Sequence, residues 1–440
     1  MSTGLGCGDV LADCSGRTMK CHSSPGVRGT RPKSTDTAEV DAGAAVGIAA
    51  VSCGLVLAAL PIFLVGGLAV QIRAELGFGE AALGAAVAGA FLIGACAAPL
   101  GGRLADRIGA RAAVWAGSTL SVVALGGIAG AAHSWGHVAA LLGLGGLAVA
   151  LTDPGLAILV ARAVPATRQG LAFGVKEASI PIATLVAGLA VPAIALTLGW
   201  RWAFTVGLVP LAGLGLLLPR LDLTRHPPTR VGTDTRAMAA GGPPRAAVLL
   251  MTVAAALGLG AASGVGVFLT ESAVAMGLSP ARAGLLLAAG SVAGIVTRIT
   301  TGVLADRNGG EQLGVISWML AAGAATMALA ASGGGPLLVV GTIGAFAAGW
   351  GWSGLLFLSL VRAFPAAPGA AAGLGVAGLA AGNALGPLLF GVAAQTVSFA
   401  AAWAGAAVTA AVAALLMRLA RSGFRTASHE GYSEVAPSPR

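Results

Sequence analysis

Long apolar segments, each followed by a short polar connection, recur along most of this chain. Each segment is about as long as the ~20 residues that an α-helix needs to cross a bilayer. The segments lack both the polar face of soluble amphipathic helices and the alternation of membrane barrel strands. Because lipid offers no partner for unpaired backbone groups, the pattern predicts transmembrane helices. The predicted segments are 43–70, 81–102, 113–132, 138–161, 169–196, 202–219, 246–270, 283–304, 313–331, 336–361, 370–394 and 400–418.

The polar connections contain an internal repeat. The run GRLADRIG at residues 102–109 follows the second apolar segment, and GVLADRNG at 302–309 follows the eighth. A second pair, RAVP at 162–165 and RAFP at 362–365, has the same offset of 200 residues. Two matches in register indicate a chain built by duplication of one half, as in many transporters.

The predicted fold is an all-α integral membrane protein with twelve transmembrane helices in two pseudo-symmetric six-helix bundles. We place the bundles at 43–219 and 246–420, joined by a polar linker at 220–245 that is rich in proline and arginine. A polar tail at 1–42, rich in Gly, Ser and Thr, is predicted to be disordered, and a second tail covers 421–440. A start codon assigned too far upstream is the expected origin of the first tail.

The distribution of positive charge predicts the orientation. The chain is 56% hydrophobic and 10% charged, whereas a soluble domain carries roughly 25% charged residues. Of the 26 Lys and Arg residues, 21 fall in the tails, the linker and one set of alternate loops, and only Arg73, Arg201 and Arg282 fall in the other loops. Positive charge collects on the cytosolic side. We therefore expect a multi-pass protein of the cell membrane with both termini in the cytosol, and we take the net charge of +9 as a consequence of topology rather than a nucleic-acid footprint.

The repeated loop resembles the signature loop of the major facilitator superfamily. The similarity rests on the pattern Gly-x-Leu-Ala-Asp-Arg-x-Gly and covers residues 43–420. The family pattern usually ends in two basic residues, but the second copy has Gly310 and Glu311 there, so that copy is degenerate. The resemblance implies a loop that switches conformation. Its candidate residues are Gly102, Asp106, Arg107, Gly109, Arg111, Gly302, Asp306 and Arg307.

The family resemblance implies a secondary active transporter that moves a small solute by alternating access. The sequence has no Gly-x4-Gly-Lys-Ser/Thr loop, so we expect a gradient, most simply of protons, to supply the energy. A drug or metabolite efflux antiporter of the same fold remains an alternative, as do an integral-membrane enzyme and a non-transporting sensor. We expect a monomer. Substrate identity and the direction of transport stay open.

Four charged residues lie inside apolar segments: Asp153, Lys176, Glu177 and Arg298. Asp153, Glu177 and Arg298 each stand nine residues from a cytosolic arginine, which places them roughly 13 Å into the membrane. An unpaired charge at mid-membrane costs at least ~2.5–3.5 kcal/mol. We therefore predict that Glu177 pairs with Arg298 across the two halves and that Asp153 pairs with Lys176. These pairs either serve coupling or substrate binding, or are purely structural.

Glycine-flanked aromatic residues and a glycine-rich segment are two further candidates. Trp350 and Trp352 are predicted deep inside the tenth segment, where they either pack between helices or line a substrate cavity. The eleventh segment resembles the glycine–proline pattern of drug antiporters, but that pattern belongs in the fifth segment of those proteins. We therefore assign Gly382, Gly386 and Pro387 to helix packing.

Metal and cofactor chemistry find little support. Cys7, Cys14 and Cys21 are spaced by seven residues, which matches no zinc pattern. His133 and His137 have no carboxylate or cysteine near them in the sequence. We expect no metal, no cofactor and no enzymatic activity, with a small molecule, membrane lipid and possible protons as the only partners.

The predicted topology can be tested with single cysteines at Arg230 and His133 in a cysteine-free background. A membrane-impermeant maleimide added from outside should label the cysteine at position 133, whereas the cysteine at position 230 should react only after permeabilisation. Labelling of both positions from the same side would overturn the orientation.

Overall fold

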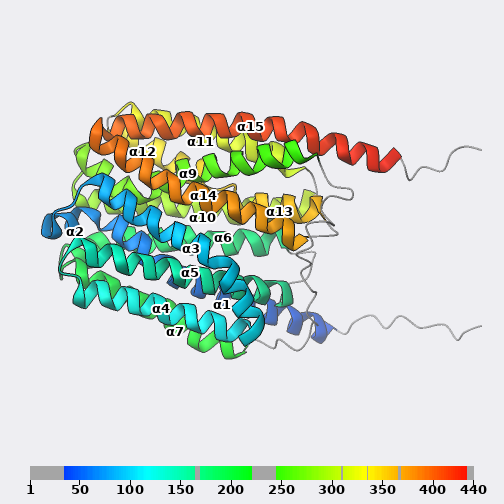
Figure 1. The fold of residues 1–440 in the computed structure, drawn as a ribbon, viewed down its shortest axis with the longest axis horizontal. Helices are drawn as coiled ribbons and strands as arrows, with labels where there is room; N and C mark the ends of the chain where they lie inside the picture. The colour runs from blue at the N-terminus through cyan, green and yellow to red at the C-terminus, as the bar shows by residue number, and fades with distance from the viewer. Residues whose placement is uncertain are drawn as a thin grey trace, which may run out of the picture. The chain divides into compact units, whose positions relative to one another are not determined.

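The computed structural model describes residues 34–163, 169–220, 244–308, 311–333, 335–364 and 368–433. Contacts divide the chain into residues 1–41 and 42–440, and the candidate site lies in the second unit. Figure 1 shows the helices. They are α1 (Ser34–Gly67), α2 (Ala69–Leu76), α3 (Glu80–Ile108), α4 (Ala110–Ala131), α5 (Trp135–Ala163), α6 (Gln169–Ala190), α7 (Leu208–Leu217), α9 (Arg245–Ala275), α10 (Pro280–Asn308), α11 (Gln312–Ala331), α12 (Gly335–Gly344), α13 (Ser353–Ala363), α14 (Pro368–Thr396) and α15 (Phe399–Ser433).

Twelve helical stretches within the described residues are long and apolar enough to cross a membrane. They coincide with the twelve predicted segments, so this prediction is confirmed. Three spans are less regular than predicted. The fifth ends in a π-helical turn, Val191–Ala195. The sixth begins with a 3-10 helix, Trp200–Gly207, before α7. The tenth consists of α12, a π-helical turn at Ala345–Gly349 and α13.

The ends of the first and last helices differ from the sequence prediction. The helix α1 begins at Ser34, so the last residues of the tail predicted to be disordered are helical. The helix α15 likewise extends to Ser433. Residues 1–33 and most of the predicted linker, 221–243, lie outside the described residues.

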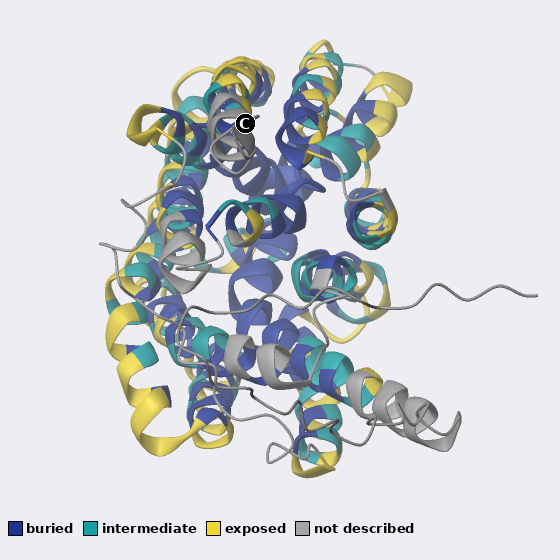
Figure 2. Cartoon of the chain, turned by 90° about the vertical axis from the view of Figure 1, so that its right-hand side faces the viewer, coloured by how far each residue is buried: buried dark blue, intermediate teal, exposed yellow. Residues whose placement is uncertain are grey.

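Large apolar side chains cover the faces of the helices that point away from the bundle. Figure 2 shows exposed residues on these faces and buried residues between the helices. Among the exposed side chains are Val209, Leu249 and Trp318, which are 76%, 65% and 68% exposed. In water such a surface would be an aggregation hazard. In a bilayer these side chains face lipid tails, as the transmembrane prediction requires.

Glycines bring α6 of the first half against α10 of the second half along their whole length. A Cβ atom added to Gly302 would lie 2.5 Å from the carbonyl oxygen of Gly170, and one added to Gly174 would lie 2.6 Å from that of Arg298. At the other end, a Cβ on Gly284 would lie 2.6 Å from the carbonyl oxygen of Gly188. Such small-residue contacts let helix backbones approach closely in a membrane.

A second set of contacts joins the halves at one end only, which we call the α2 end because it carries α2. The Thr270 hydroxyl of α9 donates to the carbonyl oxygen of Gly66 in α1 over 3.0 Å. The backbone N–H of Ala81 in α3 donates to Oε1 of Gln395 in α14 over 2.9 Å. The opposite end of the bundle carries the loops of Asp106 and Asp306, and we call it the Asp306 end.

Candidate functional site

The tenth membrane span is interrupted at Trp350–Trp352, and this break organises the candidate site. Trp350 and Trp352 were predicted to lie inside a continuous helix, and the structure corrects this: residues 350–352 are not helical. Both side chains are buried. The local sequence Gly349-Trp-Gly-Trp352 explains the break, because glycine destabilises a helix and leaves room for the large neighbouring rings. The Trp352 indole N–H donates back to the carbonyl oxygen of Gly349 over 2.8 Å.

Arg298 of α10 lies at the end of the first helical half of this span. Its Nη2 atom donates to the carbonyl oxygen of Trp350 over 2.8 Å, and the guanidinium lies 5.4 Å from the centre of the Trp350 ring. Carbonyl groups at a helix C-terminus carry partial negative charge and stabilise a cation. The Arg298 residue is only 2% exposed, and its Nε and Nη1 atoms have no hydrogen-bond partner among the described residues.

Glu177 of α6 lies at the start of the second helical half, α13. Its Oε2 atom accepts a hydrogen bond of 2.9 Å from the hydroxyl of Ser353, the first residue of α13. A helix N-terminus carries partial positive charge and favours a carboxylate. No salt bridge within 4.0 Å joins Glu177 to Arg298 among the described residues, so their predicted pairing stays a prediction. Each charge instead interacts with one end of the broken helix.

Lys176 bridges two carboxylates. Its Nζ atom lies 2.9 Å from Oδ1 of Asp153 in α5 and 3.5 Å from Oε1 of Glu177. The ammonium also lies 5.5 Å from the centre of the Phe357 ring of α13. The expected contact between Asp153 and Lys176 is thus present. Among these side chains Asp153 is the most open, at 30% exposure against 11% for Lys176 and 12% for Glu177.

The second copy of the repeated loop joins the two halves at the Asp306 end. The Asp306 carboxylate accepts hydrogen bonds from the backbone N–H groups of Gly170 (2.9 Å) and Leu171 (2.8 Å), in the first turn of α6. It also lies 4.0 Å from Nη2 of Arg362. Asp306 therefore acts as an N-cap supplied by the other half of the protein, and it satisfies donors that a helix start leaves unpaired.

The first copy of the loop is arranged differently. The side chain of Asp106 is exposed, and no hydrogen bond joins its carboxylate to a described residue. Gly109 adopts φ +89°, a backbone conformation that favours glycine. Arg107 and Arg307 are also exposed. The degenerate copy, rather than the one closer to the family pattern, makes the contact between halves.

Sequence analysis missed an ionic contact between the halves, at the α2 end. Nη2 of Arg73 lies 2.8 Å from Oε1 of Glu271 in α9, and Nη1 of Arg73 pairs with Glu80. The Glu271 side chain is only 3% exposed. The predicted seventh segment ended at residue 270, so this glutamate was assigned to a loop. The helix continues to Ala275 and carries Glu271 into the protein.

A smaller cluster at the α2 end lies within the first half. The Glu75 carboxylate accepts hydrogen bonds from the Trp200 indole (2.7 Å) and the Arg201 guanidinium (2.5 Å). These bonds lower the pKa of the Glu75 carboxyl below its usual range, so it stays ionised. Arg201 also donates to the carbonyl oxygen of Ala132 over 2.7 Å. These hydrogen bonds join the first residues of the sixth span to α2.

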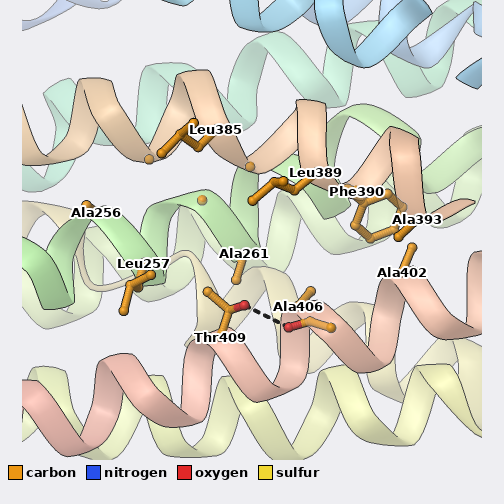
Figure 3. Close-up of a pocket in the computed structure, with 14 residues that line it drawn as sticks. Ala256, Leu257, Ala261, Leu385, Leu389, Phe390, Ala393, Ala402, Ala406 and Thr409 are labelled. Atoms are coloured by element: carbon orange, nitrogen blue, oxygen red, sulfur yellow. Dashed lines mark hydrogen bonds between the residues drawn. The ribbon is translucent and has the colours of Figure 1, made fainter. Parts of the chain in front are cut away.

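An apolar groove of about 300 Å³ lies between α9, α14 and α15 (Figure 3). Gly382 and Gly386 of α14 line it, and a Cβ atom on Gly382 would lie 2.9 Å from the backbone nitrogen of Gly260 in α9. Pro387 of α14 faces a different helix: its carbonyl oxygen lies so close to Gly84 of α3 that a Cβ atom on Gly84 would clash with it. The lining residues carry no charge, and Thr409 donates within its own helix to Gly405. The groove is thus separate from the charged site.

Comparison with known proteins decides the family. The sequence profile described as the Major Facilitator Superfamily matches residues 51–374. The chain belongs to the major facilitator superfamily. An uncharacterized MFS-type transporter of Mycobacterium tuberculosis is 33% identical over 150 residues, an alignment that covers 33% of this chain and 25% of that protein. The alignment therefore spans a quarter of that relative's length. The twelve membrane-spanning stretches within the described residues of this chain fit the fold of the family.

The contrast between the two loop aspartates can be measured in this transporter. Asp306→Ala removes an acceptor for two backbone N–H groups, and loss of a helix cap costs about 1 kcal/mol. Asp106→Ala removes an exposed carboxylate and is the matched control. We expect Asp306→Ala to lower the thermal unfolding midpoint of the purified protein and Asp106→Ala to leave it close to wild type. Equal midpoints for the two variants would contradict the capping role of Asp306.

Proposed function

We propose that this protein is a secondary active transporter that moves a small solute across the cell membrane by alternating access and couples this movement to protons. The bundles at 43–219 and 246–420 would rock against each other, with both termini in the cytosol. One observation supports this most strongly: a charged network lies at the contact between α6 of one half and the broken tenth span of the other. In transporters, discontinuous helices near mid-membrane form substrate and ion sites.

The contacts at the two ends provide elements that can open alternately. At the α2 end the halves are joined by the Arg73–Glu271 ion pair, and at the Asp306 end by the bonds from Gly170 and Leu171 to Asp306. Both sets are polar, and both can be replaced by water when an end opens. The internal repeat makes Asp106 the counterpart of Asp306. In the proposed cycle Asp106 would cap the start of α14 in a second conformation, which gives the first loop its switching role.

The network of Asp153, Lys176 and Glu177 supplies a route for proton coupling. Lys176 forms ion pairs with Asp153 and Glu177. Glu177 also accepts a hydrogen bond from Ser353 of the other half. A proton on Glu177 would remove the charge that faces the start of α13 and weaken this contact between the halves. Asp153, as the most exposed member, would exchange protons with water first. The proton gradient could then bias one conformation over the other.

Flux measurements test this function and separate it from its alternatives. The protein in proteoliposomes would be screened by solid-supported membrane electrophysiology with organic acids, amino acids, sugars and cationic drugs. Transport of cationic drugs against protons would favour the efflux antiporter. Catalytic conversion of a solute without flux would favour a membrane enzyme, and binding without flux a sensor.

Glu177→Gln should abolish the response of transport to an imposed pH gradient. The glutamine amide is neutral and can neither take up nor release a proton at this position. The matched control is Glu311→Gln, which removes a carboxylate at the surface, where Glu311 pairs with Arg421. We expect pH-gradient-driven uptake to persist in this control. Unchanged pH dependence in Glu177→Gln would exclude Glu177 as the coupling group.

The ion pair at the α2 end should control access from that side. Val267 is 1% exposed and packs against Gly66, so a cysteine there reports on opening. We expect Arg73→Gln to speed the reaction of Val267→Cys with an impermeant maleimide several-fold. Arg282→Gln, which changes an exposed arginine on the same side, should leave the rate unchanged. If both variants react alike, the Arg73–Glu271 pair does not hold this end closed.

A further inference from the structure

The guanidinium of Arg298 is the one group of the buried network whose hydrogen-bonding capacity is largely unused among the described residues. Nη2 bonds to Trp350, but Nε and Nη1 are buried and have no partner. Leaving a buried donor without a hydrogen-bond partner costs free energy. The cost is larger when the donor is charged than when it is neutral. The site therefore favours an acceptor that the described residues do not supply.

The protein's own carboxylates at this depth are engaged elsewhere. Asp153 is held by Lys176, and Glu177 is held by Lys176 and Ser353. The two ends of the broken span also keep Glu177 and Arg298 apart, because each charge binds a different end. A ligand can thus take the free nitrogens of Arg298 without displacing an existing ion pair.

The surroundings of Arg298 indicate the shape of such a ligand. The planar guanidinium matches a carboxylate, which can accept two parallel hydrogen bonds from it. The Trp350 ring lies beside the guanidinium, and Phe63 of α1 lies 5.8 Å from that ring, centre to centre. Phe346 lies 5.4 Å from the same ring. Phe63 belongs to the first half and Trp350 to the second, so both halves contribute to this aromatic contact.

We propose that the transported solute is a small carboxylate, whose carboxyl group accepts a hydrogen bond from one of the two unpartnered nitrogens of Arg298, Nε or Nη1, while its apolar part packs against Trp350 and Phe63. This assignment rests on the proposed transport function and adds the substrate class to it. The lysine and arginine balance the two carboxylates of the network, so an added carboxylate leaves one excess negative charge. A net charge at mid-membrane is costly. One proton taken up by Glu177 or Asp153 restores neutrality, so the solute and one proton move together.

Binding can be tested with matched pairs that differ only at the carboxyl group. The purified full chain in nanodiscs would be titrated with acetate, lactate, benzoate and nicotinate, and with the corresponding amides. We expect at least one carboxylate to raise the thermal unfolding midpoint while its amide does not. Arg298→Gln should weaken that binding at least tenfold, and Arg298→Lys should weaken it less. Arg282→Gln, on the same helix α10 but exposed, should bind as wild type.

Two further measurements keep the proposal falsifiable if Arg298→Gln does not fold. Trp350→Phe retains a ring but reduces its area, so it should weaken binding of benzoate more than that of acetate. In proteoliposomes, an outward gradient of the bound carboxylate should alkalinise the lumen, as reported by trapped pyranine, and empty liposomes correct for passive leak of the acid.

The outcomes separate the substrate assignment from transport itself. Carboxylate binding that depends on Arg298, with proton-linked flux, supports both. Carboxylate binding without flux supports the site and overturns transport. Flux of a neutral or cationic solute that survives Arg298→Gln overturns the carboxylate site and leaves transport intact. Equal effects of acids and amides, or no effect from any acid, also overturn the carboxylate site.

Discussion

The cost of burying charge in a membrane is the constraint on which the centre of this protein depends. Four charged side chains lie within apolar spans, where lipid offers no hydrogen bonds. The structure meets this cost by interrupting the tenth span. The carbonyl end at Trp350 faces the cation of Arg298, and the amide end at Ser353 faces the carboxylate of Glu177. The broken helix thus supplies both a negative and a positive pole between the spans without adding a further charged residue.

The close contact between α6 and α10 determines where Glu177 and Arg298 lie relative to this break. Gly174 on α6 leaves room for the backbone of α10 at Arg298, and a Cβ atom on Gly354 would lie 3.5 Å from the Cα atom of Gly174. A larger side chain at Gly174 would separate these backbones and move Glu177 away from Ser353. Small residues therefore set the geometry of the charged site, although they have no chemistry of their own. The same arrangement places residues of both halves around one point, as an alternating-access site requires.

The two halves carry copies of the same short loop motif, but these loops are used unequally in this conformation. Asp306 accepts hydrogen bonds from the start of α6, whereas the equivalent Asp106 is exposed. The Arg73–Glu271 pair holds the opposite end. These contacts are polar and lie at the ends of the spans, so water can replace them only where an end opens. The glycine contacts along α6 and α10 have no such substitute, so movement is expected to pivot about them.

The sequence alone determined the twelve spans, the repeat and the family, because hydropathy over some 20 residues and the spacing of a short motif are properties of the chain itself. It also identified the four charges inside apolar segments and the contact of Asp153 with Lys176. It did not show the helix ends that Glu177 and Arg298 contact, the break at Trp350–Trp352 or the buried Glu271. Whether a buried charge pairs with another side chain or with a helix end depends on which backbone groups lie within about 3 Å of it. That distance is set by the packing of helices far apart in the sequence, and only the tertiary structure decided it.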